Sequence, residues 1–315
     1  MSAVSLSDVA ALGGAVLLAA AGGEAFLRGV LGAAAWLRLP KLLVATTLAA
    51  FATSCPEFIV STLAALSGEP EIGLGNVLGA NVVNLTLIVG TALLIAPLRL
   101  NPAELGRDFL LALGLPLLIV GLALDGSIDR GNGLMLLTIF TGWLALLVRY
   151  ALTNGRRAHA ADPNPSVTSG PAMALLYGGV GLASLLLCGH LFVTGASGIA
   201  TALGIAPFII GATVVAVGTA MPEFVTMILS RLRGQDDVGV GTVLGSVLFN
   251  GLAIIGTAAT IHPIAATPLA MAPTVGVAIL ALLLLIPGPS RLLGRARGLL
   301  LLATYAGFVA LKLGI

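Results

Sequence analysis

Two glutamates with matching surroundings stand out in a chain that carries few charges. Glu57 lies in ATSCPEF, residues 52–58, and Glu223 lies in the near copy GTAMPEF, residues 218–224. Both segments are otherwise apolar, and neither contains Lys or Arg. A charge at the centre of a membrane-spanning helix costs about 2.5–3.5 kcal/mol on insertion scales. In such a setting the two carboxylates would need protons or metal cations to neutralise them, which makes both residues candidates for cation binding.

A proline directly precedes each of these glutamates. Proline has no N–H and clashes with the carbonyl four residues back, so Pro56 frees the carbonyl of Ala52 and disturbs that of Thr53. Pro222 acts in the same way in the second segment. In lipid, a freed carbonyl must face a cavity or find a partner. A bound cation is one such partner; a simple kink closed by a hydroxyl or a water is the alternative.

Hydroxyl groups lie within one helical turn of the first glutamate. Ser54 and Thr53 precede Glu57 by three and four residues, which places hydroxyl, carbonyl and carboxylate oxygens on one helix face. Oxygen ligands of this kind suit Ca2+ or another hard cation. The three histidines and two cysteines do not cluster in the sequence, so a zinc site is not indicated.

A second polar stripe follows each Pro-Glu segment. Positions four residues apart lie along one side of a helix, and the same positions are polar or small in both copies. The stripe is Asn76, Ala80 and Asn84 in the first copy, and Thr242, Ser246 and Asn250 in the second. Participation in an ion site and hydrogen bonding between helices are both consistent with this pattern.

The elements that position these residues are long apolar segments. The chain is 58% hydrophobic and 9% charged, with a mean hydropathy of +1.10, which indicates an all-α polytopic membrane protein. We predict ten transmembrane helices in two halves. The first five-helix repeat covers 1–152, a cytoplasmic linker covers 153–170, and the second five-helix repeat covers 171–315. The predicted helices span about 8–36, 41–66, 71–96, 105–124, 132–152, 171–201, 206–230, 238–261, 268–286 and 297–314.

Positive charges predict how the chain is inserted. Lys and Arg concentrate at the odd-numbered connections, and such an excess marks the cytoplasmic side. Both termini are therefore expected outside the cell, in a multi-pass protein of the plasma membrane, the bacterial inner membrane. Because five helices per half is an odd number, the halves must insert in opposite orientations. The first residues, MSAVSLSD, have no basic segment, so we expect no cleaved signal peptide.

The two halves match at one fixed offset of 166 residues without a gap. TSCPEF at 53–58 falls on TAMPEF at 219–224, and GLGNVLGANVVN at 73–84 falls on GVGTVLGSVLFN at 239–250. Polar residues match as well as apolar ones, which argues against chance. Inverted repeats of this kind are typical of secondary transporters, whose binding sites lie near the midplane where the repeats meet.

These paired motifs resemble the two alpha-repeats of the cation/calcium exchanger superfamily, and the chain is most similar to the prokaryotic sodium/calcium exchanger branch. The resemblance covers nearly the whole chain. It implies Ca2+ between Glu57 and Glu223, with carbonyl ligands at Thr53 and Thr219. It also implies Na+ sites that share both glutamates and use hydroxyls on four unwound segments. Transport would follow from sliding of the helices at about 8–36 and 171–201 across the other eight.

The sequence departs from the family pattern at two related positions. Ser54 is kept but its mate is Ala220, and Ser246 is kept but its mate is Ala80. Carried over by position, both serines belong to one peripheral Na+ site and both alanines to the other. Asn84 and Asn250, the remaining candidate ligands, are retained. We therefore expect a weakened or absent second Na+ site, with Ca2+ coupled to fewer Na+ ions or to protons.

The functional prediction is a secondary active antiporter that exchanges Ca2+ for Na+ by alternating access. A proton/calcium exchanger of the same fold is the alternative. An intramembrane hydrolase and a channel fit less well, because no catalytic motif is recognisable and inverted broken helices favour alternating access. We expect no enzymatic activity and no cofactor. Expected partners are Ca2+, monovalent cations and the lipid bilayer, with no nucleic acid, for a chain that functions as a monomer.

Overall fold

The protein is almost entirely helical. The computed structural model describes residues 5–99, 102–160, 170–204, 216–288 and 291–313. In chain order the helices are α1 (Leu6–Leu37), α2 (Lys41–Val44), α3 (Ala50–Thr53), α4 (Cys55–Leu66), α5 (Pro70–Val83), α6 (Val89–Ile95), α7 (Pro102–Leu122), α8 (Arg130–Ala160), α9 (Pro171–Ala202), α11 (Ala216–Thr219), α12 (Met221–Leu232), α13 (Asp236–Leu248), α14 (Ile255–Ile261), α15 (Pro268–Leu284) and α16 (Arg295–Leu313). π-Helical turns η1 (Ala45–Ala49), η2 (Asn84–Ile88) and η4 (Phe249–Ile254) join several of them.

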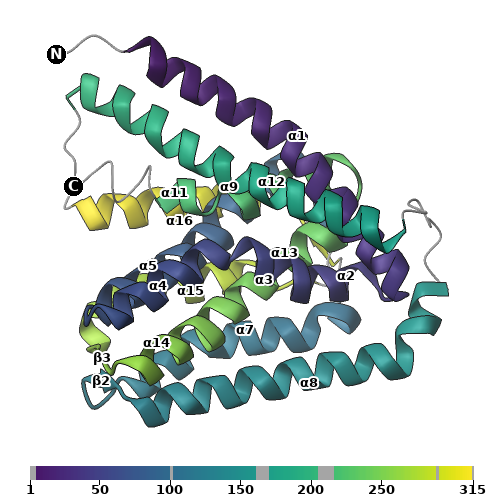
Figure 1. The fold of residues 1–315 in the computed structure, drawn as a ribbon. Helices are drawn as coiled ribbons and strands as arrows, with labels where there is room; N and C mark the ends of the chain where they lie inside the picture. Colours follow the sequence, from purple (N-terminus) through teal and green to yellow (C-terminus); the bar gives the residue numbers. More distant parts are fainter. Residues whose placement is uncertain (1–4, 100–101, 161–169, 205–215, 289–290, 314–315) are drawn as a thin grey trace.

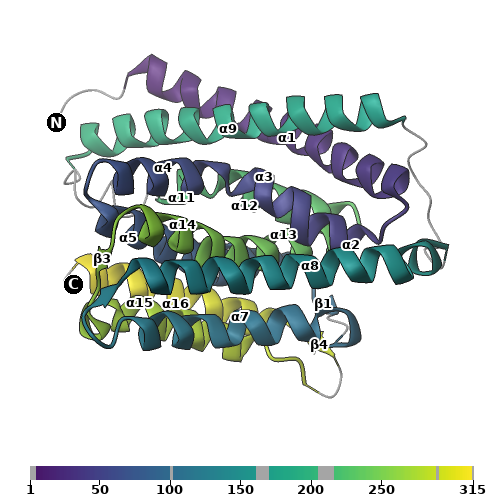
Figure 2. The same cartoon turned by 60° about the horizontal axis from the view of Figure 1, so that its bottom comes forward.

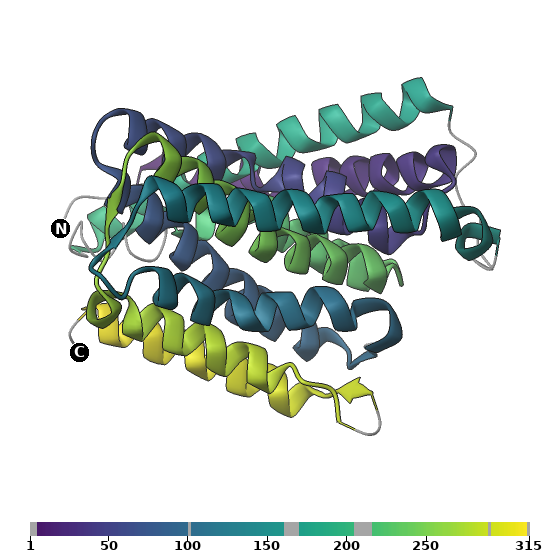
Figure 3. The same ribbon diagram turned by 90° about the horizontal axis from the view of Figure 1, so that it is seen from below.

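The helices form layers around two central spans. Helices α1 and α9 lie together on one side, and α7, α15 and α16 lie on the opposite side (Figures 2 and 3). Between them run the continuous stretches Pro70–Ile95 and Asp236–Ile261, whose most apolar windows are 72% and 100% buried. The corresponding windows of α1 and α9 are only 22% and 28% buried. The core therefore sits on α5 and α13, the helices that carry the predicted polar stripes.

Both Pro-Glu segments break their helices, as the prolines predict. The stretch Lys41–Thr53 is bent by 48° from Cys55–Leu66. The breaks fall on Ser54 and Ala220, whose backbones are nearly identical at φ −85°, ψ 8° and φ −86°, ψ 8°. Each proline then sits in the first turn of the following helix, where its missing N–H is tolerated. The break therefore starts a new helix, α4 or α12, immediately before each glutamate.

The second pair of motifs behaves differently from what the resemblance implies. Four unwound segments are expected, but the helices through Asn84 and Asn250 stay continuous and pass through the π-helical turns η2 and η4. A π-turn adds one residue to a helical turn without interrupting the helix, and such turns recur at functional sites. No proline lies in η2 or η4, so no missing N–H forces the backbone to unwind there.

Short β-ribbons join the two halves at the ends of the bundle. Strand β1 (Leu98–Arg99) pairs antiparallel with β4 (Leu292–Leu293), and β2 (Ser127–Ile128) pairs with β3 (Ile264–Ala265). Strands β1 and β3 are separated by the repeat offset of 166 residues, so they are equivalent elements of the two halves. They lie at opposite ends of the bundle (Figure 2). Equivalent elements at opposite ends are what oppositely inserted halves require.

Helices α1 and α9 run antiparallel and in close contact (Figure 1). Glycines make this contact possible: a Cβ on Gly29 would lie 2.4 Å from backbone atoms of Gly178, and one on Gly181 would lie 2.2 Å from the Phe26 nitrogen. Small residues at a membrane-helix contact let the backbones approach. The proposed sliding pair is therefore a tightly packed unit.

Six of the ten predicted spans correspond to stretches of membrane-spanning character. Among the described residues, five helices are long and apolar enough to cross a membrane, and the bent pair Lys41–Thr53 and Cys55–Leu66 adds a sixth. The beginning of the predicted span 206–230 lies outside the described residues. Helix α8 continues to Ala160, into the predicted linker 153–170. The start of α1 and the end of α16 lie at the same end of the bundle (Figure 1).

Candidate cation-binding site

The two glutamates occupy equivalent buried positions at the starts of two helices. Glu57 lies in the first turn of α4 and is 2% exposed, and Glu223 lies in the first turn of α12 and is 1% exposed. The positive end of a helix dipole stabilises a carboxylate in this position. Ser54, at the break directly before α4, hydrogen-bonds Glu223, so the segments that carry the two acids lie against each other. Two buried acids, one from each half of the chain, thus share a single region of the core.

Hydroxyl groups surround Glu223. Ser54, from the first half, donates a hydrogen bond of 3.1 Å to Glu223 Oε1, and Ser246, from α13, donates one of 3.2 Å to the same oxygen. The Thr53 hydroxyl lies 3.4 Å from that of Ser246. The structure therefore brings Thr53, Ser54, Ser246 and Glu223 together in one cluster from both halves.

Four buried oxygens in this region are without a hydrogen-bond partner among the described residues. They are Oε2 of Glu57, Oε2 of Glu223, Oδ1 of Asn84 and Oδ1 of Asn250. Asn84 opens η2 and Asn250 lies in η4, and both side chains are buried. An unpartnered buried oxygen is unfavourable by about 1–3 kcal/mol, and more when it is charged. Carboxylate and amide oxygens are the ligands that hard cations prefer, so these four atoms are candidate ligands.

The surroundings of the two glutamates differ where serine is replaced by alanine. Ala220 occupies the helix break that Ser54 occupies in the first half, and Ala80 on α5 corresponds to Ser246 on α13. Both alanines are buried. Helix α11 packs against α5, as α3 packs against α13, so the symmetric cluster would form at this contact. Methyl groups stand at both of its hydroxyl positions.

The positions of three further predicted ligands, Asn84, Asn250 and Thr219, follow from the helices that carry them. Asn84 and Asn250 lie on the central spans, and Thr219, half-buried at the end of α11, takes the place in the second half that Thr53 takes in the first. Among the described residues no three His, Cys, Asp or Glu side chains gather into a metal-binding group. The oxygens available around the two acids therefore come from hydroxyls, amides and the backbone.

Two residues important to this region are missed by the sequence analysis. Asn81 accepts a hydrogen bond of 3.0 Å from Asn250 and donates one of 3.4 Å to the carbonyl of Val247. Ser61, fully buried on α4, receives a hydrogen bond of 3.3 Å from Asn76. Asn81 lies outside the four-residue stripe and its mate is Val247, so a search for matching polar residues passes over it. Asn76 therefore links α5 to α4 by a hydrogen bond between helices, which is one of the two roles considered for the polar stripe.

Comparisons with known proteins identify the family of the chain. The family model "Sodium/calcium exchanger protein" matches residues 7–149 and 173–314. The inner membrane protein YrbG of Escherichia coli is 30% identical over 237 residues, covering 74% of this chain and 73% of YrbG. The sodium/calcium exchanger MaX1 of Methanosarcina acetivorans is 25% identical over 326 residues, covering 91% and 93%.

A solved structure has the same fold. The sodium-calcium exchanger NCX_Mj, soaked with Na+ and Ca2+, superposes with a TM-score of 0.79 at 27% identity, over 98% of this chain and 99% of that one. Its fold, the family match over both halves and the membrane-protein relatives all point to a multi-pass transporter of cations. The chain belongs to the sodium/calcium exchanger protein family.

Proposed function

We propose that the protein exchanges Ca2+ for Na+ across the membrane by alternating access, with Ca2+ bound between Glu57 and Glu223. The supporting observation is that two carboxylates, contributed by separate halves, are buried together with unpartnered oxygens. Two carboxylates balance one Ca2+, two Na+ or two protons equally well. Competing cations can therefore replace one another without leaving net charge in the core.

The proposed ligands combine those that the family resemblance implies with the buried amide oxygens and hydroxyls described above. Carbonyls at Thr53 and Thr219 and the amide oxygens of Asn84 and Asn250 would complete the shell around Ca2+. Ser54 and Ser246 would share Glu223 with one Na+. We expect the symmetric Na+ site to be weak, because Ala80 and Ala220 offer no hydroxyl. The coupling ratio would then fall below that of an exchanger with both sites.

The proposed architecture is ten spans in two oppositely inserted repeats, 1–152 and 171–315, joined by a cytoplasmic linker, with both termini outside. The placement of equivalent strands at opposite ends of the bundle supports it. Helices α1 and α9 would slide together over the remaining helices and open the site to each side in turn. We propose that the protein works as a monomer in a bacterial inner membrane, without a cofactor.

A proton/calcium exchanger is the second candidate, favoured by the same two alanines. Protons need only the carboxylates, so they could replace the missing Na+ site. Purified protein in liposomes loaded with Ca2+ would decide between them. An inward Na+ gradient at constant pH should drive Ca2+ release if Na+ is the coupling ion. Release driven by a pH gradient alone, with no response to Na+, would establish the second candidate.

A further inference from the structure

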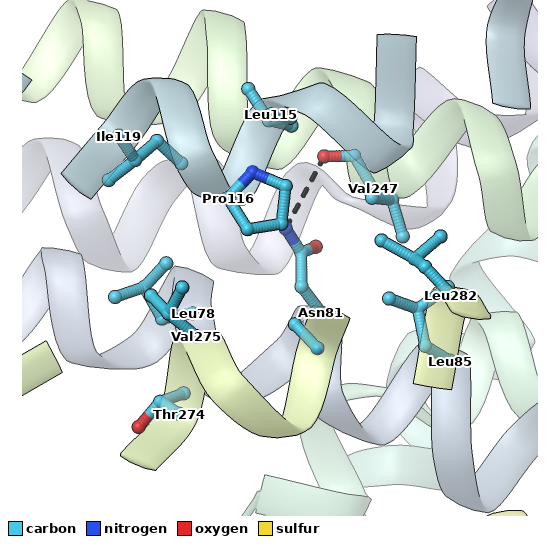
Figure 4. Close-up of a pocket in the computed structure, with 11 residues that line it drawn as sticks. Leu78, Asn81, Leu85, Leu115, Pro116, Ile119, Val247, Thr274, Val275 and Leu282 are labelled. Carbon is cyan, nitrogen blue, oxygen red and sulfur yellow. Dashed lines mark hydrogen bonds between the residues drawn. The ribbon is translucent and has the colours of Figure 1, made fainter. Parts of the chain in front are cut away.

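The side-chain amide of Asn81 is fixed in one orientation by the backbone. Asn81 is buried on α5, and its Nδ2 donates a hydrogen bond of 3.4 Å to the carbonyl oxygen of Val247 on α13 (Figure 4). A backbone carbonyl can only accept, so the nitrogen of Asn81 must face it. The oxygen of Asn81 consequently faces away from Val247.

The orientation of Asn81 in turn fixes that of Asn250. Asn250 Nδ2 donates a hydrogen bond of 3.0 Å to Asn81 Oδ1. An amide oxygen has no proton to give, so Asn250 must present its nitrogen to Asn81 and its own oxygen elsewhere. That oxygen, Oδ1, is buried and lacks a hydrogen-bond partner among the described residues. Two consecutive bonds thus hold Asn250 with an oxygen, not an N–H group, available to a ligand.

This arrangement exists on one side of the site only. The position equivalent to Asn81 in the second half is Val247, whose side chain cannot accept a hydrogen bond. Asn84, the mate of Asn250, therefore has no corresponding amide to orient it. Few other polar groups near Asn81 could orient Asn250 in its place, because the small cavity beside Asn81 is lined mainly by apolar side chains such as Leu115 and Leu282. The hydroxyl of Thr274 in the same cavity points away from Asn81 (Figure 4).

We propose that Asn81 is a positioning residue for cation binding: it holds the Asn250 amide so that its oxygen faces the ion. The inference rests on the proposed function, and it adds a residue whose hydrogen bonds go to Val247 and Asn250. An unoriented amide would present N–H groups to the cation for part of the time. Because N–H groups repel a cation, loss of Asn81 should weaken Ca2+ binding without removing any ligand.

The first test compares Asn81→Leu with Thr274→Val, which removes a polar group from the same cavity. Equilibrium binding of radioactive Ca2+ to the purified full chain in detergent gives the affinity of each. Losing one orienting hydrogen bond should weaken Ca2+ binding by about tenfold in Asn81→Leu. Thr274→Val should stay within about twofold of the parent. Equal effects of the two variants would overturn the proposal.

A double-mutant cycle separates positioning from general packing. In an Asn250→Leu background there is no amide left to orient, so adding Asn81→Leu should cause no further loss of Ca2+ affinity. A purely structural role for Asn81 predicts losses that multiply, and that result would contradict the proposal. If Asn81→Leu does not fold, Asn81→Gln serves instead, since its amide keeps both a donor for the Val247 carbonyl and an acceptor for Asn250. It should bind Ca2+ within about threefold of the parent, and a larger loss would also count against positioning.

Failure of this inference is distinguishable from failure of the proposed function. If the parent binds Ca2+ and Glu57→Gln abolishes binding, while Asn81→Leu has no effect, only the role of Asn81 is wrong. If the parent binds no Ca2+ at all, both the inference and the function beneath it are wrong.

Discussion

Ser54 and Glu223 come from different halves of the chain, and the Ser54 hydroxyl donates a 3.1 Å hydrogen bond to the Glu223 carboxylate. This bond crosses the boundary between the repeats at the point where a helix is broken. Ser246 reaches the same oxygen from the other side, at 3.2 Å. One acid is thus enclosed by hydroxyls, whereas Ala80 and Ala220 stand at the equivalent positions around its partner.

Neutralising either acid should stop transport without harming the fold. In Glu57→Gln or Glu223→Gln, Ca2+ uptake into liposomes should fall at least about 100-fold, because one of two charges that bind the ion is gone. The melting temperature without ions should stay the same or rise, since a buried charge lacking a partner is removed. Glu69→Gln, at an exposed position before α5, is the control. Transport that survives both changes would contradict the proposed role of the acids.

Exchanging serine and alanine should move the Na+ dependence in opposite directions. Ala80→Ser with Ala220→Ser would supply hydroxyls to the second site, so the Hill coefficient for Na+-driven Ca2+ release should rise towards three. Ser54→Ala with Ser246→Ala should lower it towards one, because the remaining cluster loses both hydroxyls. A parent protein with a Hill coefficient already near three would show that the alanine site is not missing.

The helix breaks could be predicted from sequence because their cause is local. Pro56 and Pro222 remove a backbone donor wherever the chain folds, and both breaks fall within two residues of them. The continuous path through Asn84 and Asn250 could not be predicted in this way. The choice between an unwound segment and a π-turn is made by the packing of the central spans, which no nearby residue reveals.

The ion pair between Glu24 and Arg233 should restrain helix α1. Glu24 Oε2 lies 2.8 Å from Arg233 Nη2, at the end of α12, and Glu24 also pairs with Arg28 on its own helix. Arg233→Gln removes the link between helices, whereas Arg28→Gln leaves it in place. An exposed pair contributes about 0.5–1 kcal/mol, so Arg233→Gln should speed Ca2+ exchange by about two- to fivefold with little change in stability. Equal rates in the two variants would argue against a restraint.

Arg231 should matter for stability rather than for transport. Its side chain is 4% exposed, pairs with Asp236, and donates to the carbonyls of Ala96 at 2.6 Å and Pro97 at 2.8 Å. Arg231→Met would leave these carbonyls and Asp236 without their partner, at a cost of about 2–3 kcal/mol. Thermal unfolding in detergent should show a drop of several degrees. Asp236→Asn keeps the Arg231 bonds to the carbonyls and should lose less; the reverse order would refute this assignment.

The candidate site shows the same limit of sequence reasoning. Both glutamates and the four hydroxyl or methyl positions could be found because they repeat at one offset. Asn81 could not, since its partners are a backbone carbonyl and a side chain of the other half, which only the folded chain brings together. Ser61 and Asn76 lie in the same half, but their hydrogen bond also forms only when α4 packs against α5.

The most direct test is to locate ions in crystals of the protein soaked first in Ca2+ and then in Na+. The account predicts one Ca2+ between Glu57 and Glu223, with oxygen ligands at about 2.3–2.6 Å. After the Na+ soak this density should disappear, and a Na+ should be found beside Ser54 and Ser246. Ca2+ bound elsewhere, or the same density between the two glutamates after both soaks, would contradict the central claim.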